Sequence, residues 1–449
     1  MKRSWARRTA ELRGEIAAIA EPDPRWWLLA GGVAAAEPWG ARQEYVRSDA
    51  EPGEDTFLGI RVAAPRDPIA DAIARARAAR TAVRELDGQL PDQRLAVTVK
   101  RTTGTVLAAN TLEVAAFAIG DQCLVATLDD PTLPRMLAGV IAGIPAPAWR
   151  GETPFVCVSI GDDPIAVARH GHRRAWLDGT GPWLGIGRTG ELATVSTCHL
   201  VVDGYGHARI TGRIAELVAT PSGPGALVIP PLAPVTDAIP LGVAWRALAG
   251  SAPHVLRLAY ALGQSLHRMA GRRAARFSPT FQIPIAPGDR SDPLRIRRRG
   301  VPGIVSVRFD AGMPEPFEAF EARAREVLAR EADGEGLCSR LLAAARGTPA
   351  PLAWKRKGIS ATRPRWLDRI SDVIGGRACL SKIRIDAPLA AACAVSSPAR
   401  LASSSDELGG CVVTVVDDGT HASITACGSG MAGTAAAAAE LIDELLARV

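Results

Sequence analysis

Hydrophobic and polar positions along the chain follow two periods, and together they predict a mixture of strands and helices. Short β-branched runs such as 95–100 and 411–416 are typical of buried strands, whereas apolar residues recur at helical spacing after Asp67 and Pro68, which suit the N-cap and first position of a helix. Strands are predicted at 56–63, 95–100, 105–108, 114–119, 123–127, 155–160, 184–188, 192–198, 281–286, 304–309, 383–385, 391–396, 411–416 and 422–427, and helices at 67–86, 131–144, 208–219, 241–269, 316–330, 337–345 and 434–449.

Proline and glycine positions divide this pattern into segments. Residues 1–55 read as an N-terminal extension, with a charged amphipathic helix followed by Trp26 and Trp27, which we expect to pack on the main body. Prolines crowd the stretch 221–240, which is predicted to be a linker between a first half at 56–220 and a second half at 241–449. A chain of 449 residues is long enough for two domains of this size.

A candidate catalytic motif, His199-Leu200-Val201-Val202-Asp203-Gly204, stands between the predicted strand 192–198 and the predicted helix 208–219. A loop histidine can act as a general base, because its pKa lies near neutral pH and its second ring nitrogen can be held by a hydrogen bond. Asp203 is expected to hold the loop by pairing with an arginine, and Gly204 to leave room for backbone or substrate. A loop histidine followed by an ordinary Asp-Gly turn is the alternative interpretation.

The chain also contains a weak internal repeat. Residues 181–219 align without a gap on residues 409–447, so that a strand, a turn, a strand, a loop and a helix recur about half a chain apart. In this alignment Cys427 replaces His199, Met431 replaces Asp203 and Ala432 replaces Gly204. The repeat predicts two like halves, of which the first keeps the motif.

His199 to Gly204, the flanking Gly-Ile-Gly-Arg at 185–188 and the helix ending at 214–219 resemble the H-x-x-x-D-G acyltransferases. This superfamily includes chloramphenicol acetyltransferase, dihydrolipoyl acyltransferases, wax ester synthases and the condensation domains of peptide synthetases. The resemblance implies an α/β fold of the α+β sandwich type: a pseudodimer of two chloramphenicol acetyltransferase-like domains with a tunnel between them. It also implies acyl transfer from a pantetheine thioester, coenzyme A or a carrier protein, to a small hydroxyl, amine or thiol acceptor, with His199 as the base.

The resemblance further implies an oxyanion donor from the other half of the pseudodimer. The candidates are Ser396 and Ser397, at the end of the predicted strand 391–396, because small polar residues followed by proline resemble the family's pattern at the oxyanion-donor position. A strand-end turn that uses serine and proline is the alternative interpretation of the same residues. Two features depart from the family. Cys198 stands where many members have a second histidine, and the second half lacks a D-F-G-W type signature.

Composition and residue spacing argue against several other classes of protein, namely metal-binding, nucleic-acid-binding and membrane-spanning proteins. Net charge is +6, the eight cysteines and seven histidines lack metal-ligand spacing, and the glycines at 179–185 lack dinucleotide-loop spacing, so we expect no metal and no tightly bound cofactor. The basic residues lie apart without aromatic interleaving, which argues against nucleic acid. Apolar runs are too short for a transmembrane segment, and the N-terminus lacks the apolar stretch of a secretory signal, so a cytoplasmic enzyme is expected.

Two other functions fit the same residues. A catalytically inactive binding or scaffold protein of the same fold would be free to lose His199, Asp203 and Gly204, which are all present. A serine hydrolase would need a G-x-S-x-G elbow, which the sequence lacks. Basic residues at 295–299 and 355–357 suit the phosphates of coenzyme A or an acidic carrier protein, and solvated loops explain them as well.

Overall fold

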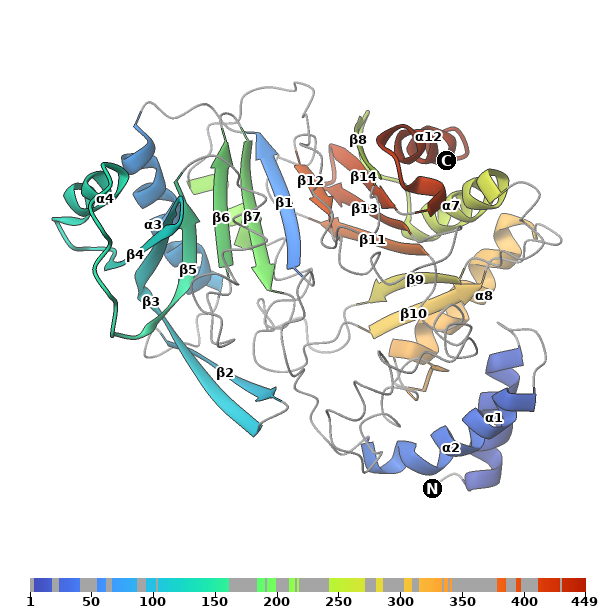
Figure 1. Cartoon of the computed structure of the whole chain (residues 1–449). Coiled ribbons are helices and arrows are strands. Elements are labelled where there is room, and N and C mark those ends of the chain that lie inside the picture. The colour runs from blue at the N-terminus through green and yellow to red at the C-terminus, as the bar shows by residue number, and fades with distance from the viewer. Residues whose placement is uncertain are drawn as a thin grey trace.

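The computed structural model describes a mixed α/β chain with strands gathered into two sheets (Figure 1). The described residues are 4–17, 24–40, 55–61, 67–86, 94–101, 104–160, 184–189, 192–198, 210–214, 216–217, 242–270, 280–285, 303–308, 315–332, 335–337, 340, 378–384, 393–396, 411–428 and 430–449. His199, Asp203, Gly204, Ser397 and the expected linker 221–240 lie outside them.

The first sheet, sheet A, is built mainly from the first half of the chain. Its strands run in the order β12-β1-β7-β6-β5-β3-β2, with β4 pairing on β3. The strands are β1 (Asp55–Arg61), β2 (Arg94–Arg101), β3 (Gly104–Ile119), β4 (Gln122–Thr127), β5 (Thr153–Ser159), β6 (Leu184–Thr189), β7 (Leu192–Cys198) and β12 (Cys393–Ser396). The long β3 replaces two shorter strands predicted at 105–108 and 114–119, because its first part pairs with β2 and its second with β4 and β5.

The second sheet, sheet B, runs in the order β10-β9-β11-β13-β14-β8. Its strands are β8 (Gly242–Leu248), β9 (Thr280–Ile285), β10 (Gly303–Arg308), β11 (Ala378–Arg384), β13 (Cys411–Asp417) and β14 (Ala422–Gly428). The predicted helix 241–269 is wrong in its first part, because residues 242–248 pair with β14 as a strand. The helix begins only at Val255, after Gly250 with φ +97° and Pro253 have ended the strand.

Both sheets contain the same six-stranded arrangement. Read along the sheet, β1-β7-β6-β5-β3-β4 matches β8-β14-β13-β11-β9-β10 in position. Each successive pair also has the same direction: antiparallel, antiparallel, parallel, parallel, antiparallel. The repeat expected from 181–219 and 409–447 therefore has a counterpart in the hairpins β6–β7 and β13–β14.

The residue pairing within that repeat needs one correction. Thr197 lies opposite Leu184, and Cys427 lies opposite Val412, the counterpart of Leu184 in the alignment. Cys427 therefore corresponds to Thr197, and the gapless replacement of His199 by Cys427 is wrong by two residues. The shift arises because the two hairpin turns differ in length: four residues separate β13 from β14, whereas two separate β6 from β7.

Helices cover the sheets and complete two separate apolar cores. In the first half, α3 (Pro68–Leu86) and α4 (Leu133–Ile141) pack with β3, β4 and β5. In the second, α7 (Val255–Ala270), α8 (Phe317–Ala332), a short 3-10 turn at Gly430–Ala432 and α12 (Ala435–Leu446) pack against strands of sheet B. The helix predicted at 67–86 is confirmed over 68–86, and Asp67 caps it as expected by accepting from the amides of Ile69 and Ala70 at 2.9 and 3.1 Å.

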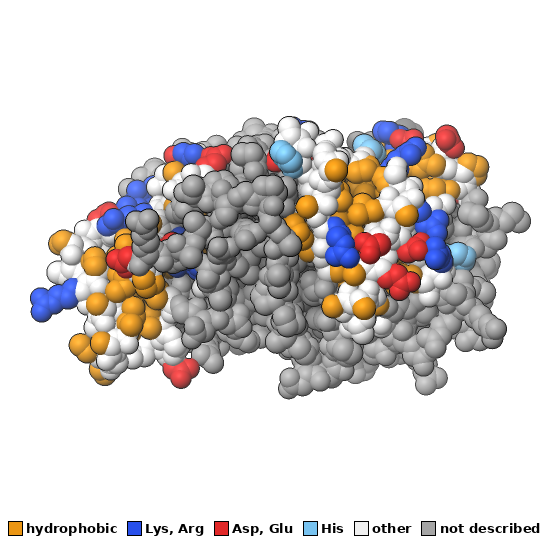
Figure 2. All heavy atoms as spheres, turned by 90° about the horizontal axis from the view of Figure 1, so that it is seen from above, with side chains coloured by type: hydrophobic (Ala, Val, Ile, Leu, Met, Phe, Trp, Pro, Cys, Tyr) orange, Lys and Arg blue, Asp and Glu red, His pale blue; other side chains and the backbone are white. Residues whose placement is uncertain are grey.

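Charged side chains are paired across the α12 end of the molecule. Arg246 of β8 lies 3.3 Å from Asp443, and Arg268 of α7 lies 2.7 Å from Glu444. Figure 2 shows blue and red side chains next to each other on this end. Among the helices of the described residues, none is both long enough and apolar enough to cross a bilayer.

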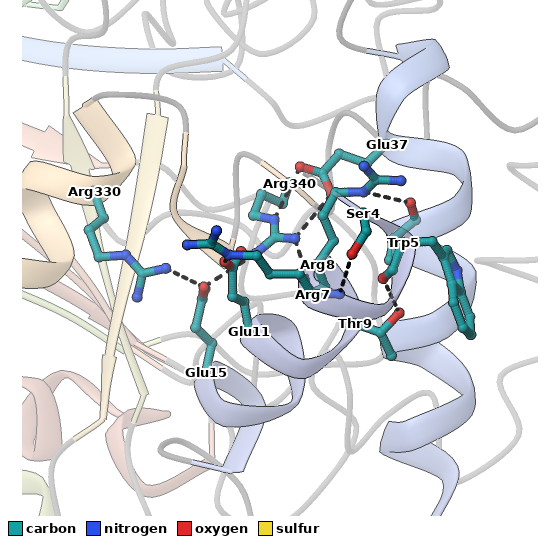
Figure 3. A network of polar contacts seen from close by, with 11 residues as sticks. Ser4, Trp5, Arg7, Arg8, Thr9, Glu11, Glu15, Glu37, Arg330 and Arg340 are labelled. Atoms are coloured by element: carbon teal, nitrogen blue, oxygen red, sulfur yellow. Dashed lines mark hydrogen bonds and ion pairs between the residues drawn. The ribbon is translucent and has the colours of Figure 1, made fainter. Parts of the chain in front are cut away.

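The N-terminal extension forms two helices, α1 (Trp5–Ala17) and α2 (Pro24–Gly40), which pack on each other. The second helix contains the two tryptophans and was not predicted as helix. Arg340 fixes this pair to the second half: its guanidinium, 2% exposed, lies 3.1 Å from Glu37, 3.5 Å from Glu15 and 3.6 Å from Glu11 (Figure 3). The extension thus contacts the second half through its carboxylates, and the expectation that its tryptophans make this contact is wrong for Trp27, which is 57% exposed.

Candidate functional site

The candidate motif follows directly on the last residue of β7. Cys198 ends this strand, opposite Asp55 at the start of β1, and His199 is the next residue in the sequence, outside the described residues. Leu184, the first residue of β6, lies opposite Thr197 on the other side of β7. Neighbouring strands thus hold the backbone that leads into the motif from both sides.

The chain that follows the motif is also anchored. Residues 210–214 and 216–217 are helical, and Ile210 and Ile214 are buried in the core of the first half. Arg213 lies 2.6 Å from Glu85 at the end of α3 and 2.7 Å from Glu216. Eleven residues, 199–209, therefore connect a fixed strand end to a fixed helix.

Strand β12 brings the second half of the chain to the same edge. It pairs antiparallel with β1, which in turn pairs antiparallel with β7, so β12 and β7 run parallel and end at one edge of sheet A (Figure 1). Phe57 of β1 lies opposite both Ser396 and Ser196. Ser396 is therefore level with Ser196, two strand spacings or roughly 10 Å away.

The same strand also contacts β13 and β14 of sheet B. Consequently β12 belongs to sheet A by hydrogen bonding and to the second half by sequence, and it lies where the two halves meet. The sequence predicts this strand at 391–396. Sequence reasoning gave no signal for its partner, because four residues of β-branched and small character can pair with any strand edge.

A buried ionic cluster lies at the opposite edge of sheet A. Arg188, at the end of β6, places Nη1 2.6 Å from Asp71 of α3, and Arg75 places Nε 2.9 Å from the other oxygen of the same carboxylate. Arg75 also donates to the carbonyl oxygen of Ser159 at 3.3 Å. Burial lowers the pKa of Arg75, while Asp71 opposes that shift. The cluster joins α3 to β5 and β6, and sequence reasoning missed it.

That cluster lies at the other end of β6 and β7 from Cys198, the last described residue before the motif. Thr197 is opposite Leu184, whereas Arg188 is four residues further along β6, opposite Ala193 near the start of β7. Arg188 belongs to the Gly-Ile-Gly-Arg segment noted in the sequence, and its role is to bind Asp71 of α3. The charge of Arg188 therefore stabilises the packing of α3 against β6 in the first half.

Several cysteines lie in the strands of both sheets. Cys157, Cys379, Cys411 and Cys427 are buried, and Cys123 is partly buried. Burial raises the pKa of Cys123 to about 11, and burial together with Cys379 and Cys427 raises that of Cys411 to about 12. Within the described residues, no group of three or more histidine, cysteine, aspartate or glutamate side chains is arranged to hold a metal ion.

Comparison with known proteins gives distant structural similarities. No family model matches the chain, and no curated protein matches it. The chain is similar to the starter condensation domain of rhizomide synthetase RzmA, with 12% identity over 93% of this chain and 95% of that chain and a TM-score of 0.41. The condensation domain from Monacolin K polyketide synthase MokA gives the same four values. A variant RzmA domain in complex with C8-CoA and Leu-SNAC has 12% identity, coverage of 93% and 92%, and a TM-score of 0.41.

Proposed function

We propose that this chain is an acyltransferase that moves an acyl group from a pantetheine thioester to a hydroxyl, amine or thiol acceptor. The observation that carries this proposal is the common edge at which β7 and β12 end. It supports a site in which His199, supplied by the first half, and a serine, supplied by the second, act on the same substrate. Two groups from distant parts of the sequence then meet because β1 pairs with both strands.

His199 is the general base in this proposal. Its imidazole removes the proton of the acceptor while the acceptor attacks the thioester carbonyl. The resulting tetrahedral oxyanion collapses, the carbon–sulfur bond breaks, and the proton passes from the imidazolium to the leaving thiolate. Each well-placed hydroxyl or amide donor to the oxyanion would contribute about 3 kcal/mol of transition-state stabilisation.

Of the two candidate oxyanion donors, we favour Ser397 over Ser396. Ser396 is level with Ser196, three residues short of His199, and Ser397 is one residue nearer the edge. Ser397 is the first residue after β12, just as His199 is the first residue after β7. We therefore propose Ser397 as the hydroxyl that acts with the base.

Asp203 and Gly204 are proposed to shape the loop between β7 and the helix at 210–217. A carboxylate paired with an arginine would hold the eleven-residue connection closed, and glycine would permit close approach of substrate. The donor would be acyl-coenzyme A or an acylated carrier protein, and the acceptor a small molecule. The basic residues at 295–299 and 355–357, outside the described residues, are the candidates for phosphate or carrier recognition.

We further propose that the architecture is a pseudodimer of two chloramphenicol acetyltransferase-like halves. The shared six-strand order of the two sheets supports this, since both position and direction repeat. The proposed boundaries are 56–220 and 241–449, with β12 crossing from the second half to sheet A.

The decisive experiment follows thiol release from acyl thioesters, on coenzyme A and on a carrier protein, with mixed small acceptors. Turnover by the wild type should disappear in His199→Ala, with Ser397→Ala lowering kcat more than Ser396→Ala. The matched control is His421→Ala, because His421 lies in the exposed β13–β14 turn and its side chain is 56% exposed. Equal turnover in wild type and His199→Ala would reject the mechanism.

A non-catalytic binding protein of the same fold is the alternative from another class. The presence of the complete motif in the first half disfavours it. The same panel separates the two, because a binding protein would retain thioester affinity without releasing thiol, and His199→Ala would leave that affinity unchanged.

A further inference from the structure

Arg75 of α3 is buried, and only part of its hydrogen-bonding capacity is used. The residue is 3% exposed. Its Nε donates to Oδ2 of Asp71 at 2.9 Å, and its Nη2 donates to the carbonyl oxygen of Ser159 at 3.3 Å. Within the described part of the chain, the third nitrogen, Nη1, is buried without a hydrogen-bond partner. A buried donor left in this state is costly, and more so when the group is charged.

A second buried polar group lies on the same contact. Ser159, the last residue of β5, is 1% exposed, and its Oγ is also among the buried atoms that have no hydrogen-bond partner in the described structure. The carbonyl oxygen of Ser159 already accepts from Arg75, so the two residues touch. Because a hydroxyl can donate as well as accept, both residues have a donor to offer to one ligand.

The charge of Arg75 is also incompletely balanced. Asp71 gives one carboxylate oxygen to Arg75 and the other to Nη1 of Arg188, at 2.6 Å, so one carboxylate serves two guanidinium groups. Burial lowers the pKa of Arg75 more than Asp71 raises it. Arg80 of the same helix differs: both of its terminal nitrogens donate to Asp129, at 2.7 and 2.9 Å, and its pKa is raised. The surroundings of Arg75 therefore favour a further negative charge.

We propose that Arg75 and Ser159 bind a small monovalent anion, such as chloride, between α3 and the end of β5. Nη1 of Arg75 and the hydroxyl of Ser159 both donate to it, and guanidinium groups are well suited to anions. A water molecule would accept a hydrogen bond but leave the buried positive charge unbalanced, and a cation would be repelled. The burial of both residues selects a small ion, because the outer oxygens of a phosphate or sulfate would lose their water. This site is independent of the catalytic proposal.

The test is urea unfolding of the full chain at fixed pH and ionic strength, with chloride replacing the larger anion methanesulfonate. An ion that binds only the folded state lowers the unfolding equilibrium constant by the factor 1 + [Cl⁻]/Kd. For the wild type we expect a fall of about elevenfold when chloride is at about ten times its Kd. Arg75→Met should abolish this dependence. Ser159→Ala should weaken it, and this smaller change keeps the test available if Arg75→Met does not fold.

The matched control is Ser265→Ala. Ser265 is fully buried in α7 of the second half, where its Oγ donates to the carbonyl oxygen of Ala261 at 2.8 Å. Loss of this buried hydroxyl should lower stability and leave the chloride dependence as in the wild type. Two results would overturn the proposal. Equal stability of the wild type in both salts would mean that a buried water alone lies there, and full chloride dependence in both Arg75→Met and Ser159→Ala would locate the ion elsewhere.

Discussion

Ser396 of β12 and Ser196 of β7 lie level with each other on either side of Phe57 of β1, although two hundred residues separate them in the sequence. This register fixes where the second half of the chain enters the sheet of the first. It also makes the ends of both strands neighbours at the edge where His199 begins.

Proline substitutions in β12 test this joint. Neighbouring residues of an edge strand direct their N–H groups alternately toward and away from the partner strand. Of Ala394→Pro and Val395→Pro, one should therefore remove a hydrogen bond to β1 and cost about 1 to 3 kcal/mol, while the other is tolerated better. Urea unfolding and thioester turnover measure both effects. Similar behaviour of the two variants would contradict the observed β1–β12 ladder.

The cluster of Arg75, Asp71 and Arg188 predicts a large stability effect. Asp71→Asn leaves two buried guanidinium groups without their shared carboxylate and should lower the free energy of unfolding by about 3 to 5 kcal/mol. Arg75→Met should cost less, because the remaining Asp71–Arg188 pair is neutral. Arg7→Gln is the control: it breaks an exposed pair on one helix and should cost no more than about 0.5 kcal/mol. Denaturant unfolding that ranks Asp71→Asn with Arg7→Gln would rule out this role.

Arg340 predicts how the N-terminal helices are held. Arg340→Met leaves Glu11, Glu15 and Glu37 close together without the buried cation between them. We expect faster hydrogen exchange and proteolysis of residues 4–40 with little change in the two sheets. Arg325→Gln serves as the control, since Arg325 is 61% exposed and its ion-pair partner among the described residues is Glu321 of the same helix, at i, i+4. Protection of 4–40 that survives Arg340→Met would show that apolar contacts alone hold the helices.

The raised thiol pKa values predict slow alkylation of the folded protein. Cys123, with a pKa of about 11 against an ordinary value of 9.0, should have roughly a hundredfold less thiolate at pH 8 than an exposed cysteine. The sign for stability follows from the same shift. Because the folded state holds this proton more tightly, stability is complete below pH 9 and declines as pH rises toward 11. Mass spectrometry after iodoacetamide, with and without denaturant, checks the first point; rapid modification of Cys123 in the folded chain would contradict it.

Sequence reasoning was most accurate where a single element decides its own conformation. The helix beginning after Asp67 was predicted correctly, because its cap and its apolar spacing are local properties. It failed at 242–248, where an apolar run was assigned to a helix and instead pairs with β14. Apolar character alone does not distinguish a buried helix from a buried strand. Residues 242–248 form a strand because β14 offers them a backbone edge with which to pair.

The sequence by itself determined the candidate chemistry and most of the strands: a histidine after a β-branched run, a loop, a helix, and a second hairpin of the same kind half a chain later. Tertiary structure alone decided which strands became neighbours. The pairing of β12 with β1, the engagement of Arg188 by Asp71 and the burial of Arg340 among three glutamates all join residues far apart in the chain. Such contacts depend on which backbone edges and charged groups are still unpaired once the local elements have formed. A local pattern of residues cannot predict these distant partners.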